Sequence, residues 1–169
     1  MKHFIILAGG EGKRALGRKN KLPKQFYNYA NISPLEYLLS SINKHHLIDS
    51  ITIVVNKNHR KLVNDLPKKY KKIENIVNGG LSRHESSFKG LNLLFKKYNV
   101  TKNDIVLIHD AARPFVSKKL ITNCLNKLES YDGVFPSLDV DDTLRKKVTL
   151  DIVNRNSLIT SQTPQAFNL

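Results

Sequence analysis

Three glycines follow the first apolar stretch of the sequence, in the run LAGGEGKR. Glycine has no Cβ and accepts positive φ, so Gly9, Gly10 and Gly12 allow backbone N–H groups to approach a phosphate chain closely. Arg14 in the same run and Lys24 in the following Pro-Lys-Gln can supply positive charge. We therefore expect a phosphate-binding loop here.

Two other kinds of glycine loop do not fit this run. The dinucleotide-binding fingerprint needs a third glycine at G-x-G-x-x-G spacing and a carboxylate about 20 residues further on, and both are missing. The lysine and hydroxyl pair of the P-loop NTPases is also missing. An ordinary tight turn stays open as the alternative to a phosphate-binding loop.

A second glycine turn, GGLSRHES at residues 79–86, again follows an apolar stretch and leads into an amphipathic one. Its hydroxyls and its arginine precede a predicted helix, whose N-terminus favours anions, so this turn could hold a base and ribose. The alternative is a generic strand-to-helix loop in which Ser82 caps the helix and Glu85 completes a capping box. The two interpretations are compatible.

A third run, HDAARPF, begins at the carboxyl end of the apolar stretch VLI, where open α/β sheets place their ligands. Asp110 is the natural metal ligand in it. Transfer of a nucleotidyl group expels pyrophosphate, so it needs a divalent ion and several cations, and Mg²⁺ suits one or two carboxylates plus phosphate oxygens. The alternative is a structural ion pair between Asp110 and Arg113. We interpret His109 as a packed residue at a strand end.

Two weaker runs lie near the end of the chain, around Asp142-Thr143 and from Arg155 to Gln165. Arginine and hydroxyl groups suit a second, smaller phosphate, because the guanidinium fork matches phosphate oxygens in two contacts. Without the other runs, Thr163-Pro164 would be assigned to a turn.

The elements that must position these runs alternate short apolar stretches with longer amphipathic ones, which indicates βαβ units and a mainly parallel, Rossmann-like α/β sheet flanked by helices. One amphipathic stretch carries Phe88, Leu91, Phe95 and Tyr98 at helical spacing, and we expect that stripe in the core. The predicted strands are 4–7, 51–55, 73–77, 105–108 and 133–136. The predicted helices are 34–46, 57–66, 84–98 and 117–130, with Ser33 and Ser117 as caps.

Length and composition predict one globular domain over residues 1–169. The regular alternation stops after Pro136, so we expect residues 139–155 to form a projecting β-segment. No stretch approaches the ~18 apolar residues of a membrane span, and no signal-peptide cleavage site follows Met1, so we expect no membrane partner and a cytoplasmic location. The 28 Lys and Arg against 14 Asp and Glu attract polyanions, but lysine-rich runs favour a solvated face. We expect the single cysteine, Cys124, to be a buried residue that packs in the core.

Taken in order, LAGGEGKR, PKQ, GGLSRHES, HDAARPFV, DDT, RNSL and QTPQAF resemble the motif set of the 2-C-methyl-D-erythritol 4-phosphate cytidylyltransferases, over nearly the whole chain. The resemblance implies transfer of CMP from CTP to the polyol phosphate, with Mg²⁺ on Asp110, in non-mevalonate isoprenoid precursor biosynthesis. The implied catalytic residues are Arg14, Lys24, Asp110 and Arg113. The implied nucleotide-binding residues are Ala8, Gly9, Gly10, Gly12, Gly80, Arg83, Ser86 and Ala111, and the implied acceptor-binding residues are Thr143, Arg155 and Thr163.

The same resemblance implies a homodimer in which the segment 139–155 reaches the partner's site, so that Thr143 and Arg155 act in trans. The sequence departs from the family pattern in two places. The stretch Ala15–Pro23 is a few residues longer than usual, and the chain stops at Leu169, where members of the family continue with a last strand and helix. We therefore expect a C-terminally short form, a fragment, or part of a fusion with the cyclodiphosphate synthase of the pathway.

Two alternatives stay open beside this function, and a third is less favoured. Ribitol 5-phosphate cytidylyltransferases share the glycine loop and the cytidylyl chemistry. An incomplete domain could bind nucleotide without turnover. A nucleic-acid-binding module would match the positive charge, but it would need lysines and aromatic residues interleaved on one face, whereas the aromatic residues occupy core-like positions, so we do not expect it.

Overall fold

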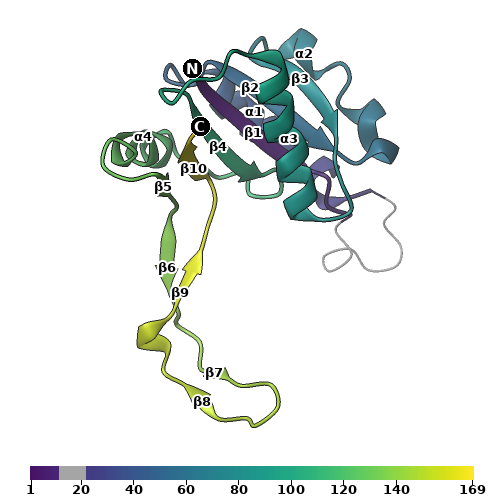
Figure 1. The fold of residues 1–169 in the computed structure, drawn as a ribbon. Helices are drawn as coiled ribbons and strands as arrows, with labels where there is room; N and C mark the ends of the chain where they lie inside the picture. The colour runs from purple at the N-terminus through teal and green to yellow at the C-terminus, as the bar shows by residue number, and fades with distance from the viewer. Residues whose placement is uncertain (12–21) are drawn as a thin grey trace.

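The computed structural model describes residues 1–11 and 22–169, and a six-stranded sheet in the order β3-β2-β1-β4-β10-β5 forms its centre (Figure 1). The strands β1 to β4 are parallel, and β10 runs antiparallel to both β4 and β5. This confirms the predicted Rossmann-like, mainly parallel sheet. The strands are β1 (Lys2–Ala8), β2 (Ser50–Val55), β3 (Ile73–Asn78), β4 (Ile105–Asp110), β5 (Gly133–Val134) and β10 (Gln165–Asn168).

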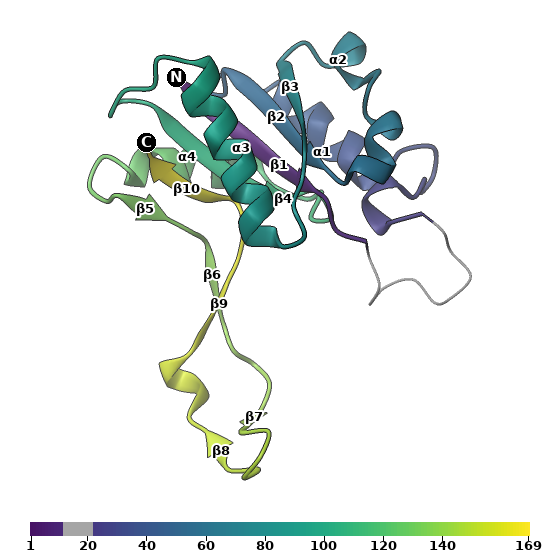
Figure 2. The same ribbon diagram turned by 45° about the vertical axis from the view of Figure 1, so that its right-hand side comes forward.

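Helices cover both faces of the sheet (Figure 2). On one face, α1 (Pro34–Asn43) and α4 (Lys118–Lys127) pack against alternate residues of β1, including Phe4 and Ile6. On the other face, α3 (Arg83–Lys97) packs against Ile5 and its neighbours. Because successive strand residues point to opposite faces, a central strand buried on both sides is apolar throughout, as β1 is.

The predicted helix caps are confirmed. Ser33 accepts a hydrogen bond from the Glu36 N–H, and Ser117 accepts one from the Leu120 N–H. Each cap satisfies an amide that has no partner within its helix. Cys124 is buried on the inner side of α4, as predicted, and burial raises the pKa of its thiol.

The predicted apolar stripe of α3 is wrong in part. Phe88 and Phe95 are 61% and 57% exposed, and the residues that α3 buries are Ser86, Gly90 and Leu94. The helix lies so close to the sheet that a Cβ at Gly90 would be 3.1 Å from a methyl group of Ile5. This close approach decides which face of the helix is buried.

The predicted helix 57–66 is also wrong. The chain instead forms η2 (Lys57–Leu62), a 3-10 segment, and the short helix α2 (Leu66–Lys69), with Pro67 in its first turn. Proline lacks an N–H and is tolerated only in the first turn of a helix, so it limits how this stretch can be helical. A further 3-10 turn, η1 (Lys24–Phe26), follows the first glycine run.

A long two-stranded extension, which we call the arm (residues 137–161), projects from the β5–β10 edge of the sheet (Figure 1). At its root β6 (Ser137–Asp139) pairs with β9 (Ile159–Ser161), and near its tip β7 (Leu144–Arg145) pairs with β8 (Ile152–Val153). The 3-10 turn η3 (Arg155–Ser157) lies between these ribbons. The predicted projecting segment is thus present and longer at both ends, while the predicted strand 133–136 is shortened to two residues. Among the described residues, no helix has the length and apolar character to cross a bilayer.

Candidate active site

The first glycine turn follows the carboxyl end of β1, and the side chain of Gln25 holds it by hydrogen bonds. The Gln25 amide nitrogen donates to the carbonyl oxygens of Ala8 and Gly10, at 2.9 and 2.7 Å, and the side chain is buried. These two bonds fix the orientation of two peptide planes in the turn. Gly12 and Arg14 lie outside the described residues.

The second glycine turn lies beside the first, and Ser86 joins them. The buried Ser86 hydroxyl accepts the Gly80 N–H at 3.0 Å, and its oxygen lies 3.6 Å from the position of a Cβ on Gly9. Two runs separated by about 70 residues therefore form one surface at the carboxyl edge of the sheet, where α/β folds bind ligands.

The capping interpretation of the second turn is confirmed with one change. Ser82 accepts the Glu85 N–H at 3.0 Å, whereas the Glu85 carboxylate accepts the N–H of Leu81 rather than that of Ser82. The Glu85 side chain consequently folds over Gly80, where an added Cβ would be 2.5 Å or less from three of its carbons. Gly80 is required for this packing.

Asp110 lies between two arginines at the end of β4. Its Oδ1 accepts from Nε of Arg83 at 3.2 Å, and its Oδ2 accepts from Nε of Arg113 at 3.3 Å. The predicted alternative of an Asp110–Arg113 ion pair is present, and Arg83 extends it to a cluster with surplus positive charge. Both arginine side chains are about half exposed, so the cluster faces solvent and can meet an anionic ligand.

Two glutamines of the QTPQ run hold the outer ends of these arginines. Gln165 Oε1 accepts from Arg83 Nη2 at 3.0 Å, and Gln162 Oε1 accepts from Arg113 Nη1. Sequence reasoning noticed the run but assigned no role to either glutamine, nor to Gln25. Their spacing carries no signal by itself, because the partners of all three are brought close only by the fold.

His109 is a packed residue, as predicted. Its ring is buried, its Nε2–H donates to the carbonyl of Arg113 at 2.9 Å, and its Nδ1 accepts from the Thr163 hydroxyl at 2.9 Å. Burial lowers the pKa of His109, which agrees with a neutral ring that donates at one nitrogen and accepts at the other. Thr163 Oγ1 also accepts the Asp110 N–H at 3.5 Å, so Thr163 lies beside the Asp110 cluster.

The other two predicted acceptor residues lie in the arm. Thr143 and Arg155 are exposed, and an Arg155 N–H donates to the carbonyl oxygen of Asp141 within the arm. Figure 1 shows the tip of the arm well away from β4. Within one chain the structure brings Thr163 to Asp110 and does not bring Thr143 or Arg155 there.

Two further predicted residues flank the glycine turns. Lys24 is exposed at the start of η1, directly before the buried Gln25. Ala111 is buried and donates its N–H to the carbonyl of Leu7 at 3.0 Å, which ties the end of β4 to β1. Ala111 can thus offer a small, close-packed surface rather than a side-chain hydrogen bond.

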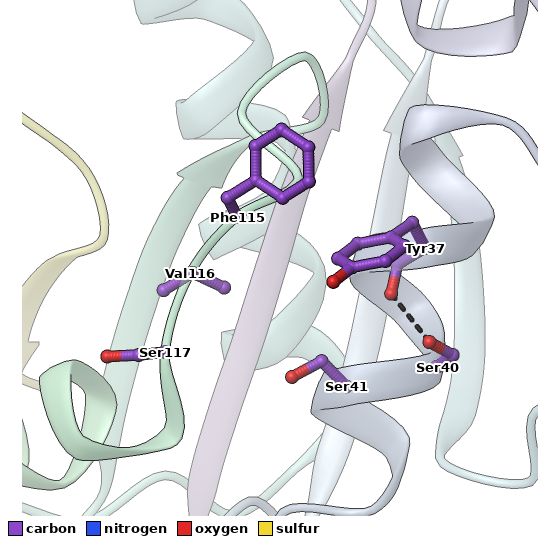
Figure 3. A pocket seen from close by; sticks show the side chains of 6 residues that line it. All are labelled: Tyr37, Ser40, Ser41, Phe115, Val116 and Ser117. Carbon is purple, nitrogen blue, oxygen red and sulfur yellow. Dashed lines mark hydrogen bonds between the residues drawn. The ribbon is translucent and has the colours of Figure 1, made fainter. Parts of the chain in front are cut away.

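A separate pocket of about 370 Å³ lies between α1 and the segment that follows Pro114 (Figure 3). Phe115 and Tyr37 meet edge to face across it, with ring centroids 5.3 Å apart. None of its lining side chains is charged, so it does not suit a triphosphate, and we place the candidate site at Asp110 instead. The lining residues are Tyr37, Ser40, Ser41, Phe115, Val116 and Ser117.

Asp110 is the residue that could hold a metal ion. Within residues 1–11 and 22–169, no three His, Cys, Asp or Glu side chains gather into a metal-binding group. Mg²⁺ bound together with a nucleotide needs only one or two carboxylates, because phosphate oxygens and water complete its shell. The partly exposed Asp110 carboxylate fits that requirement.

Comparison with known proteins decides the family. The sequence model of the family described as "IspD: 2-C-methyl-D-erythritol 4-phosphate cytidylyltransferase" matches residues 2–169. The chain belongs to this cytidylyltransferase family. The predicted resemblance is therefore confirmed, and the match includes the arm as well as the sheet.

Relatives of the cytidylyltransferase family include longer proteins. A bifunctional enzyme IspD/IspF of Pelagibacter ubique is 40% identical over 98% of this chain, which spans 42% of that protein. A 2-C-methyl-D-erythritol 4-phosphate cytidylyltransferase of Clostridium botulinum is 36% identical over 97% of this chain, which spans 71% of it. The crystal structure of 4-diphosphocytidyl-2C-methyl-D-erythritol synthase from Anaerococcus prevotii superposes with a TM-score of 0.78 at 26% identity, covering 99% of this chain and 70% of that one.

Proposed function

We propose that this chain transfers CMP from CTP to 2-C-methyl-D-erythritol 4-phosphate and releases pyrophosphate, as a step in isoprenoid precursor biosynthesis. The family supports the reaction class. The observation that carries the proposal is the bond between Arg83 of the second glycine run and Asp110 of the third, next to the Ser86 contact that joins both glycine turns. Three runs with phosphate-binding chemistry thereby share one edge of the sheet.

In this reaction an oxygen of the acceptor phosphate attacks the α-phosphorus of CTP while the bond to the β-phosphate breaks in line. No covalent enzyme intermediate forms, so positioning and charge stabilisation supply the rate. The backbone of Ala8, Gly9, Gly10 and Gly12 would bind the phosphates, while Gly80, Ser86 and Ala111 would lie along the nucleoside. Arg14, Lys24, Arg83 and Arg113 would offset the charge that moves to pyrophosphate.

Mg²⁺, held by Asp110 together with phosphate oxygens, would neutralise phosphate charge and polarise the phosphorus. The two arginines that now bond the Asp110 carboxylate keep it at the mouth of the site before nucleotide arrives. Each carboxylate oxygen has a second lone pair, so these bonds leave room for a metal ligand.

The acceptor would lie between Thr163 and a second copy of the chain. Thr143 and Arg155 are carried by the exposed arm, which projects away from its own site (Figure 1). The arm also exposes large apolar side chains, among them Val148 at 92% and Ile152 at 66%, which a partner would shield from water. A homodimer that exchanges arms would complete each acceptor site in trans.

The test is pyrophosphate release with CTP, Mg²⁺ and either methylerythritol phosphate or ribitol 5-phosphate, with Asp110→Ala as the control. Turnover with methylerythritol phosphate that the control loses would support the proposal. Turnover with ribitol phosphate alone would show that the acceptor is ribitol phosphate instead of methylerythritol phosphate. Tighter calorimetric binding of a short oligonucleotide than of CTP would contradict the assignment as a cytidylyltransferase. If neither acceptor gives pyrophosphate release although CTP binds, the chain would be a nucleotide-binding domain without turnover.

A further inference from the structure

Two hydrogen-bonded chains of the same composition converge on Asp110. One runs from Thr160 through Gln162 and Arg113 to Asp110, and the other runs from Ser161 through Gln165 and Arg83 to the second carboxylate oxygen. Each chain consists of a hydroxyl, an amide and a guanidinium.

The arginines determine which way each amide points, because a guanidinium only donates and therefore needs the amide oxygen, while a hydroxyl accepts from the other end. Gln162 Nε2 donates to Thr160 Oγ1 at 3.2 Å, and Gln165 Nε2 donates to Ser161 Oγ at 3.5 Å. An amide whose nitrogen is engaged in this way presents its oxygen, which is the atom that a guanidinium needs. Both hydroxyls belong to β9, at the root of the arm.

The backbone holds both glutamines in place. The Gln162 N–H donates to the carbonyl of Pro136 at 2.8 Å, and Gln165 pairs with Ile108 in the antiparallel ladder of β10 and β4. Each glutamine is only partly exposed, whereas the side chains of Arg83 and Arg113 are about half exposed. The backbone therefore anchors the glutamines, whereas the guanidinium groups depend on side-chain contacts for their position.

An exposed arginine with a single partner samples many rotamers, and ordering it when a ligand arrives costs conformational entropy. A guanidinium gripped at Nε by Asp110 and at Nη by a glutamine loses that freedom before the ligand arrives. Preorganised charge of this kind costs no reorganisation during the reaction.

We propose that Gln162 and Gln165 are positioning residues, and that each holds one arginine in the orientation that binds the triphosphate. Through their bonds to Thr160 and Ser161, the two glutamines also link the arginines to the root of the arm. The role in substrate binding rests on the proposed function. The hydrogen bonding of each arginine to Asp110 and to one glutamine, which we call the grip, is a property of the ligand-free chain and can be measured without any substrate.

The first measurement is nuclear magnetic resonance of the arginine Nε–H groups in the ligand-free chain. Gln165→Ala should speed the exchange of the Arg83 Nε–H with water and leave that of Arg113 unchanged, and Gln162→Ala should do the reverse. Asn168→Ala is the matched control, because Asn168 lies in β10 like Gln165 but its side-chain amide donates to the carbonyls of Leu128 and Tyr131 instead of contacting an arginine. It should change neither signal.

The second measurement is calorimetric binding of CTP with Mg²⁺ in double-mutant cycles. Loss of either glutamine should weaken binding about tenfold, the size expected for one hydrogen bond to a charged group. Gln165→Ala should have little further effect once Arg83→Ala is present, and Gln162→Ala should have little further effect once Arg113→Ala is present. The crossed combinations should be closer to additive, and the thermal midpoint should stay near that of the parent chain.

Unchanged arginine exchange in both glutamine variants would overturn the proposal, as would additive effects within each pair. Paired changes in exchange together with a parent chain that does not bind CTP would leave the grip standing and remove the proposed function. If the parent chain binds CTP but arginine exchange is unchanged in the variants, the proposed function would stand and the positioning role of the glutamines would be wrong.

Discussion

Arg83 and Asp110 are 27 residues apart in the chain, yet Nε of Arg83 lies 3.2 Å from Oδ1 of Asp110. The bond joins the first turn of α3 to the last residue of β4. Because Arg113 binds the other carboxylate oxygen, one acidic residue gathers two cations that belong to different motifs. The proposed site for a polyanion and a divalent ion rests on this arrangement.

We expect Asp110→Asn to affect phosphate binding in opposite directions with and without metal. Without Mg²⁺ the substitution removes a negative charge next to two arginines, so CTP should bind more tightly. With Mg²⁺ it removes the proposed metal ligand, so CTP should bind more weakly than to the parent chain. Calorimetry in the presence of chelator and then of Mg²⁺ measures both effects, and a change of the same sign in both would contradict the metal assignment.

Lys24→Ala should reduce turnover by at least about a hundredfold, since the lysine would offset charge in the transition state. The side chain is exposed on η1, so the thermal midpoint should move by less than about 2 °C. Lys102→Ala, an exposed lysine at the opposite end of β4, is the matched control and should retain activity. Equal losses of stability and activity in Lys24→Ala would instead indicate a structural role. We expect the same behaviour of Arg14→Ala.

The two glycine turns should respond differently to alanine. A Cβ on Gly80 would be 2.2 to 2.5 Å from Glu85 carbons, so Gly80→Ala should lower the free energy of unfolding by about 1–3 kcal/mol. A Cβ on Gly10 meets nothing within 4 Å, so Gly10→Ala should leave stability nearly unchanged and weaken CTP binding by filling space for a phosphate. Urea unfolding and calorimetry on both variants measure these effects. A stable Gly80→Ala variant would show that Glu85 moves aside at little cost.

Gln25→Leu should destabilise the chain by about 1–3 kcal/mol, because it leaves the buried carbonyl oxygen of Ala8 without this donor and also removes the bond to the more exposed carbonyl of Gly10. The same loss should loosen the first glycine turn and weaken CTP binding. Urea unfolding measures the first effect and calorimetry the second. Stability equal to that of the parent chain would mean that water replaces the amide.

His45 should make the fold more sensitive to mild acid. Burial lowers the pKa of His45, and the lysines 72 and 118 and the neighbouring His46 act in the same direction, while its bond to the Lys118 carbonyl opposes them. A folded-state pKa below the unfolded value of about 6.5 gives stability that is complete above that pH and is lost as pH falls through the folded pKa. Protonation of Nδ1 would also break the bond that it accepts from the Leu47 N–H.

We therefore expect the free energy of unfolding to fall between pH 7.5 and 5.5, and to fall less in His45→Asn, whose amide oxygen can still accept from the Leu47 N–H. Urea unfolding across this range measures the difference. The exposed His46→Asn is the control and should keep most of the slope of the parent chain. Identical slopes for all three chains would show that His45 does not titrate differently in the two states.

The alternation of apolar and amphipathic stretches was enough to predict the α/β class, the first four strands and three of the longer helices. Period and capping are local properties, so Ser33, Ser82 and Ser117 could be recognised as caps from their neighbours alone. The exposed Phe88 and Phe95 could not be predicted, because the close approach of Gly90 to β1 and β2 is a tertiary contact. Strand β10 could not be predicted either, since it is short and finds its partners only at the edge of an existing sheet.

The sequence by itself determined which groups are available for the proposed chemistry, because glycine turns, carboxylates and guanidinium groups are residue types that suit phosphate and metal ligands. Only the tertiary structure decided which of these groups meet. It joined the two glycine turns through Ser86, attached Arg83 to Asp110, placed Thr163 beside His109, and left Thr143 and Arg155 on the arm. The physical reason is that a parallel sheet brings the carboxyl ends of separate strands to one edge, whatever their distance along the chain.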